Sequence, residues 1–69
     1  MVTFKDANQV RLALKMKFYH YTWYKSSLVA QDNDGYLVVI GVNKLDNQVR
    51  KLISPVVDGV SVKVEIDRK

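Results

Sequence analysis

The chain has 69 residues, a formal net charge of +4 and no cysteine. This length suits one small domain and excludes two, and the lack of Cys excludes disulfides, thiol catalysis and thiolate metal sites. Apolar residues make up 48% and charged residues 26% of the chain, as in globular rather than disordered proteins. With one His and one Glu, the sequence predicts a protein that is not an enzyme and carries no cofactor or metal.

The first residues lack the charged and apolar regions of a signal peptide. The longest dense apolar run, residues 36–42, is far shorter than the roughly 18–20 residues that span a bilayer. We therefore expect a cytoplasmic protein without a membrane-spanning segment.

Apolar residues recur every three or four positions from about residue 6 to residue 19, which predicts a helix. Thr3 or Asp6 can serve as its N-cap. The residues expected to face the core are Ala7, Val10, Leu14 and Phe18. Three further apolar residues fall on nearly the opposite face, where they are either tolerated at the surface or contact a partner: Leu12, Met16 and Tyr19.

Residues 22–31 are rich in aromatic and β-branched types and predict a strand. Residues 32–35 form a turn, and residues 36–42 return as a second, antiparallel strand. With Lys25 taken as pointing to solvent, alternation places Trp23 on the outer face of the sheet and Leu28 on the opposite face. The second strand is apolar on both sides, so Leu37 and Val39 also fall on the outer face.

Asp46 precedes a short helical pattern that Pro55 ends. Asp58-Gly59 then turns the chain into a strand, residues 60–66, whose valines alternate with polar residues. The predicted fold is a single α+β domain, residues 1–69, of order α-β-β-α-β: a two-layer sandwich with a three-stranded mixed sheet and two helices on one face. The pattern does not decide which hairpin strand pairs with the last strand.

The run from Gly35 to Val42, followed by a helix and then Asp58-Gly59-Val60, resembles the BON domain pattern of a strand between two glycines and a Gly-Val before the final strand. The resemblance extends to the α-β-β-α-β order. It implies the same fold and a role in attachment to anionic phospholipid or in protein association.

The main functional hypothesis is a small adaptor or accessory protein that binds a protein partner or a second copy of itself, as a homodimer. An apolar sheet face on so small a domain is commonly covered by a partner protein or by a second copy. The expected interface consists of Trp23, Leu37 and Val39 on the sheet, and Leu12, Met16 and Tyr19 on the first helix.

An alternative comes from the aromatic run 18–24, which lies among lysines. Exposed rings and ammonium groups together are typical of single-stranded nucleic-acid binding, although the same rings can instead pack into the core. Beside Tyr19 and Trp23, the residues expected to contact nucleic acid or another anion are Arg11, Lys15, Lys17 and Lys25. No KH, RRM or zinc motif is present.

Overall fold

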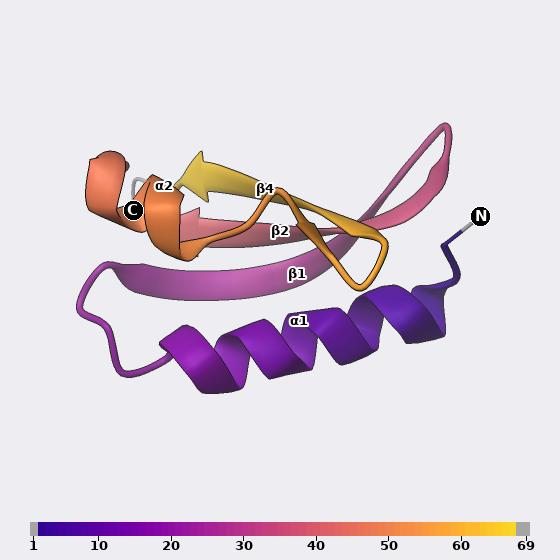
Figure 1. Cartoon of the computed structure of the whole chain (residues 1–69), viewed down its shortest axis with the longest axis horizontal. Coiled ribbons are helices and arrows are strands. Elements are labelled where there is room, and N and C mark those ends of the chain that lie inside the picture. Colours follow the sequence, from indigo (N-terminus) through magenta and orange to yellow (C-terminus); the bar gives the residue numbers. More distant parts are fainter. Residues whose placement is uncertain (1, 68–69) are drawn as a thin grey trace.

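Two helices and four strands make up residues 2–67, the part of the chain that the computed structural model describes (Figure 1). In chain order the elements are α1 (Phe4–Phe18), β1 (Tyr24–Asp32), β2 (Gly35–Val42), α2 (Asn47–Leu52), β3 (Val56–Val57) and β4 (Val60–Ile66). The α+β class is confirmed, whereas the expected count of three strands is wrong.

Helix α1 begins at its predicted cap. The Thr3 hydroxyl accepts a hydrogen bond from the backbone N–H of Asp6 at 3.2 Å, which satisfies one of the free donors of the first turn. Its four predicted core residues are all buried, and they pack against the sheet: Ala7, Val10, Leu14 and Phe18.

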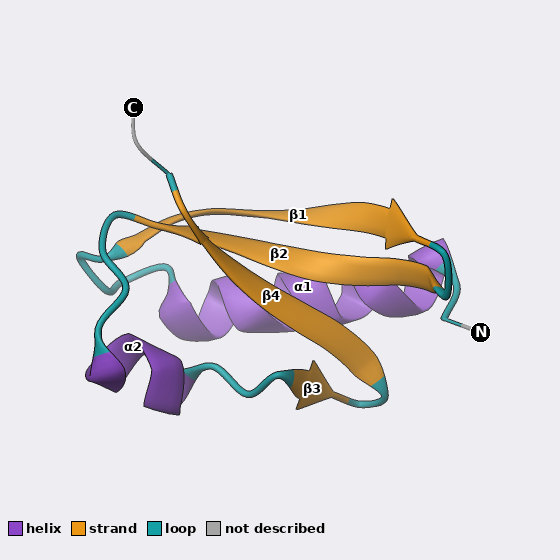
Figure 2. Cartoon of the chain, turned by 90° about the horizontal axis from the view of Figure 1, so that it is seen from above, coloured by secondary structure: helices purple, strands orange, loops and turns teal. Residues whose placement is uncertain are grey.

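The strands form one sheet in the order β1-β2-β4-β3. β2 pairs with β1 in an antiparallel hairpin and with β4 in parallel, so it lies inside the sheet, as a strand that is apolar on both faces should. This arrangement answers the question that the sequence left open: the last strand joins the second strand of the hairpin. β1 forms one edge of the sheet (Figure 2).

Strand β3 was not predicted. It has two residues, too few for an alternation to be visible, and it pairs with the start of β4. The turn between them places Asp58 at φ +51° and Gly59 at φ +79°. Two positive φ angles are what a two-residue hairpin turn needs, and Asp-Gly is a preferred pair for it. The sequence signal was therefore present but was interpreted only as a turn.

Helix α2 is short and buries Val49 in the common core. Both views place it beside the sheet, at the end where α1 finishes, so α1 alone lies across the sheet face (Figures 1 and 2). Of the two helices expected on one face of the sheet, only α1 covers that face, and α2 lies at the side of the sheet. Within residues 2–67, no helix is long and apolar enough to cross a membrane.

We expect Asp46→Ala to lower the Tm at neutral pH. Asp46 caps α2, where its Oδ1 accepts a hydrogen bond from the N–H of Val49 at 3.0 Å, and this bond lowers the pKa of the carboxyl below 3.8. A lowered folded-state pKa means stabilisation that is present above the unfolded-state pKa and is lost as the pH falls through the folded-state pKa. The Tm gap between wild type and variant should therefore narrow in acid, as measured by thermal denaturation.

Asp46→Asn keeps a side-chain acceptor and serves as the control, with a cap that does not depend on pH in this range. A gap between wild type and Asp46→Ala of equal size at neutral pH and well below pH 3.8 would argue against the cap.

Candidate interaction surfaces

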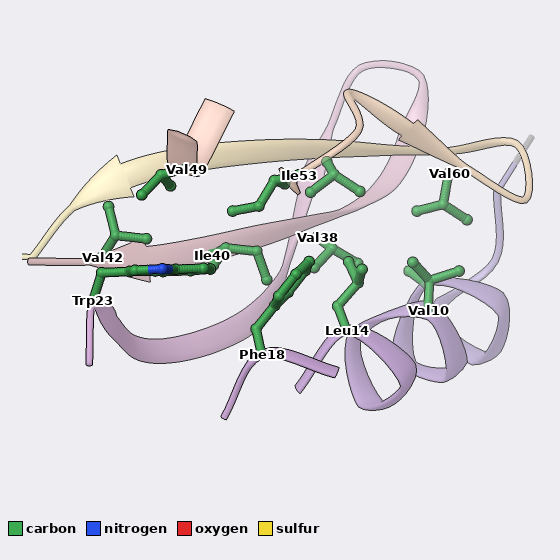
Figure 3. Packing of buried hydrophobic residues seen from close by; sticks show 12 residues of the cluster. Val10, Leu14, Phe18, Trp23, Val38, Ile40, Val42, Val49, Ile53 and Val60 are labelled. Carbon is green, nitrogen blue, oxygen red and sulfur yellow. The ribbon is translucent and has the colours of Figure 1, made fainter. Parts of the chain in front are cut away.

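Trp23 lies in the core. Its side chain is 7% exposed, and its ring centroid is 5.5 Å from that of Phe18. Figure 3 shows Trp23 beside Val42 and Ile40, with Phe18 reaching up from α1. The expectation that Trp23 belongs to an exposed outer face is therefore wrong, and this ring contributes to the stability of the fold.

Alternation does not apply to Trp23, because this residue lies in the turn before β1, which begins at Tyr24. The assignment of Leu28 to the core has a different cause, a β-bulge. Tyr24 pairs with Val42 and Ser26 pairs with Gly41, so Lys25 is an extra residue in β1. Alternation counted across an extra residue slips by one position, and a slip of one moves every side chain to the other face.

The actual outer face, on the side away from α1, can be traced from the strand pairing. Its central residues are Leu37 and Val39, which belong to β2 but not to the core cluster. They lie on the predicted face, but they are only 4% and 8% exposed, so the expected exposed patch is wrong. We define the outer sheet face as Ser26, Leu28, Ala30, Leu37, Val39, Gly41, Ser61, Lys63 and Glu65.

Neighbouring strands explain this burial without a covering helix. Val39 pairs with Leu28 on one side and with Lys63 on the other, and both are long enough to lean over it. Leu28 has no such protection because β1 is the last strand of the sheet, and its side chain is 50% exposed. Leu28, which was expected to face the core, is therefore the apolar residue that this face presents to solvent.

A shallow hollow of about 210 Å³ lies on the same face, next to Leu28. It lies at Gly41, which has no side chain to fill the space. A Cβ at Gly41 would meet the hydroxyl oxygen of Ser26 at 2.7 Å, so a glycine here lets β1 and β2 approach closely. The side chains of Glu65 and Asp67 also line the hollow.

The back of α1 carries the apolar residues that helical periodicity placed there. Their side chains are exposed by 44% at Leu12, 71% at Met16 and 62% at Tyr19. This surface faces away from the sheet, because the opposite side of α1 provides the core residues. No single flat contact can use both this surface and the outer sheet face.

An aromatic ladder links the core to the surface after α1. Tyr21 stacks on Trp23 with ring centroids 5.0 Å apart, and His20 stacks on Tyr21 at 4.5 Å. Tyr19 then meets His20 edge to face at 5.8 Å. Trp23 is buried, whereas the rings of Tyr19, His20 and Tyr21 are exposed, so the run is core at one end and surface at the other.

Charges are segregated along the long axis of the molecule. The start of α1 and the two hairpin turns lie at one end, and the ends of α1, β2 and β4 lie at the other, together with α2 (Figures 1 and 2). The first end carries Lys5, Asp6, Asp32, Asp34 and Asp58. The second end carries Lys15, Lys17, Lys25, Lys44, Arg50 and Lys51, together with Asp46, Glu65 and Asp67. We call them the acidic end and the basic end.

All four cations that the sequence proposed for anion contact lie outside the core. Arg11 and Lys15 lie on α1, and the Nε of Arg11 donates to the Oδ1 of Asn8 at 2.9 Å. Lys17 places its Nζ 5.5 Å from the centre of the Phe18 ring. Lys25 is the bulged residue at the start of β1, so it belongs to the sheet edge rather than to α1.

No family model, curated protein or solved structure matches the chain. Among residues 2–67, no group of three His, Cys, Asp or Glu side chains could hold a metal ion. The surfaces described above therefore carry the functional argument.

Proposed function

We propose that this protein is a non-enzymatic interaction module that pairs with a second copy of itself along the free edge of β1. The observation that carries the proposal is a nine-residue edge strand with a half-exposed leucine at its middle. The residue inventory, with one His and no Cys, supports binding rather than catalysis.

An edge strand presents a row of backbone N–H and C=O groups that another strand can bind. In residues 2–67, β1 has a strand neighbour on one side only, and the pairing from Ser26 to Asp32 is regular. Lys25 and its bulge interrupt the edge near one end, where they limit uncontrolled growth but leave the rest of the strand available.

Two identical strands that pair antiparallel share a two-fold axis. Leu28 is the fifth of the nine residues of β1, so an axis through Leu28 pairs residues 26–30 of the two copies in register, with the bulges beyond each end. It also brings the two exposed leucine side chains together on the outer sheet face, where each covers the other. We therefore propose that Leu28 faces Leu28 of the second copy.

Charge favours the same alignment. β1 starts at the basic end and finishes at the acidic end, so antiparallel pairing sets the basic end of one copy beside the acidic end of the other. Lys25 then lies near Asp32 of the second copy, and Asp32 near its Lys25. A parallel arrangement would place like charges together, which destabilises cross-strand neighbours.

The exposed residues on the back of α1 take no part in this contact, because they lie on the other side of the molecule. A different protein could add a strand to the same edge and would then compete with the second copy. The phospholipid attachment implied by the BON resemblance would need a separate surface.

Sedimentation velocity over a wide range of protein concentration tests the proposal. We expect the weight-average mass to rise from 7.9 kDa toward twice that value. Raising the salt from low to moderate levels should weaken the association only modestly, because it screens the exposed charges but not the leucine contact. A monomer that persists at the highest concentration would refute the proposal.

A further inference from the structure

We propose that the rings and cations at the end of α1 bind single-stranded nucleic acid. The site consists of Tyr19, His20 and Tyr21, together with Arg11, Lys15 and Lys17. It is independent of the β1 edge, so each proposal can fail without the other.

The rings supply surfaces on which bases can stack. Tyr19, at the outer end of the ladder, is 62% exposed and offers the ring on which a base can stack. Tyr21 lies between His20 and Trp23, so it supports the ladder rather than receiving a base. Because each ring rests on the next, from Tyr19 down to the buried Trp23, the ladder is held in place by the core. A rigid aromatic surface loses little entropy when a base stacks on it, and such stacking tolerates any base.

The cations lie in a row that leads to these rings. Arg11, Lys15 and Tyr19 are spaced by four residues, so they follow one another on the same face of the helix, about 6 Å apart along its axis. The helical geometry continues to Tyr19, whose backbone N–H donates to the carbonyl of Lys15 at 2.8 Å. Lys17, two residues from Lys15, lies on the other flank of the helix near Phe18, where it adds a further positive charge at this end of α1.

Glu65 and Asp67, at the same end of the molecule, line the hollow on the outer sheet face, on the side away from α1. α1 carries one carboxylate, Asp6, in its first turn at the opposite end, and the Asp46 carboxylate is engaged with Lys44 at 3.6 Å. The row therefore offers positive charge followed by the exposed ring of Tyr19. A single strand can place its phosphates on the cations and its bases on the rings, whereas the bases of a duplex are stacked on one another and are not available.

Fluorescence anisotropy of a fluorescein-labelled oligothymidylate of about 12 nucleotides tests the site. We expect binding to weaken with salt at a log–log slope of about −2, which corresponds to about three phosphates neutralised on a single strand. Tyr19→Ala and Lys15→Ala should each raise the Kd about tenfold. The emission of Trp23, the single Trp, reports in the same samples that the core stays folded.

Two matched variants distinguish binding at this site from general attraction by net charge and from stacking on any exposed ring. Lys5→Ala removes one charge from α1 at the acidic end, and Phe4→Ala removes a ring there that is 55% exposed. Both should leave the Kd within about twofold of wild type, a change well below the loss of one stacked base. If Lys5→Ala weakens binding as much as Lys15→Ala, attraction by net charge accounts for the binding and the site is refuted.

Two competitors complete the test. A duplex of the same sequence and length, and dextran sulfate of equal charge, should compete less well than unlabelled oligothymidylate. Equal competition by dextran sulfate would overturn the proposal. So would binding to phosphatidylglycerol vesicles in the absence of any binding to the oligonucleotide, an outcome that would instead support phospholipid attachment.

Discussion

Trp23→Ala is expected to leave most of the protein unfolded. The indole is 7% exposed and packs against the rings of Phe18 and Tyr21, so its removal opens a large cavity. A buried aromatic residue replaced by Ala costs about 3–5 kcal/mol. A domain of this size has about the same total stability, because a single small core rarely supplies more. Urea denaturation followed by circular dichroism measures the loss.

Met16→Ala is the matched control for Trp23→Ala. Met16 is 71% exposed on the back of α1, so its truncation should change the free energy of unfolding by less than about 0.5 kcal/mol. Equal urea midpoints for the two variants would place the indole at the surface and contradict the core described above.

Leu28→Lys is expected to abolish self-association while leaving the monomer folded. The side chain is half exposed in the monomer, so the change costs the isolated fold little. Both copies of the symmetric dimer carry the substitution, and each lost leucine contact is worth about 1.5 kcal/mol. The dissociation constant should rise on the order of a hundredfold. Two lysines that face each other add repulsion. Sedimentation velocity at matched concentrations measures the shift.

Met16→Lys introduces the same charge on the back of α1 and should not alter the dissociation constant. If Met16→Lys dissociates the dimer and Leu28→Lys does not, the contact lies on the helix surface rather than on β1. That surface also carries the exposed side chains of Leu12 and Tyr19.

Local patterns predicted most of the fold because they span several residues. The three- and four-residue spacing from Ala7 to Phe18 reflects a helix with one buried side, and that side is buried. The alternation from Val60 to Ile66 matches the bounds of β4 and the inward side of Val60, Val62 and Val64, whereas Ile66 at the end of the strand is 44% exposed. The cap at Asp46 is likewise in place. Each of these signals depends on neighbours in sequence rather than on contacts between distant segments.

The candidate site was predicted less well, because β1 contains a bulge at Lys25 and because Trp23 precedes the strand. Lys25 looked like a guide to the solvent side, but as a bulged residue it belongs to neither side of the alternation. Alternation from Lys25 therefore predicts that Leu28 faces the core, whereas Leu28 lies on the outer face. The same alternation predicts that Trp23 faces outward, but Trp23 lies in the turn before β1 and packs in the core. The clustered polar residues 25–27 are a sequence feature that, with hindsight, is compatible with a bulge.

Burial by lateral neighbours also escaped the sequence. Leu37 and Val39 do lie on the outer face, but their exposure depends on which strands flank β2. The pairing of β2 with both β1 and β4 is a long-range feature that single-strand patterns do not encode. The exposed residue of the face is therefore found at the sheet edge rather than at its centre.

Disulfide formation by Leu28→Cys tests the proposed pairing most directly, because the natural chain has no cysteine to compete. Across an antiparallel pair, opposite Cβ atoms are about 4.5–5.5 Å apart, within reach of a disulfide after a small adjustment. In the same register, two copies of residue 26 are four positions apart, about 14 Å along the strands. We predict rapid oxidation of Leu28→Cys to a covalent dimer, with slow oxidation of Ser26→Cys and Met16→Cys. Oxidation at residue 28 no faster than at residues 26 and 16 would contradict the β1 pairing.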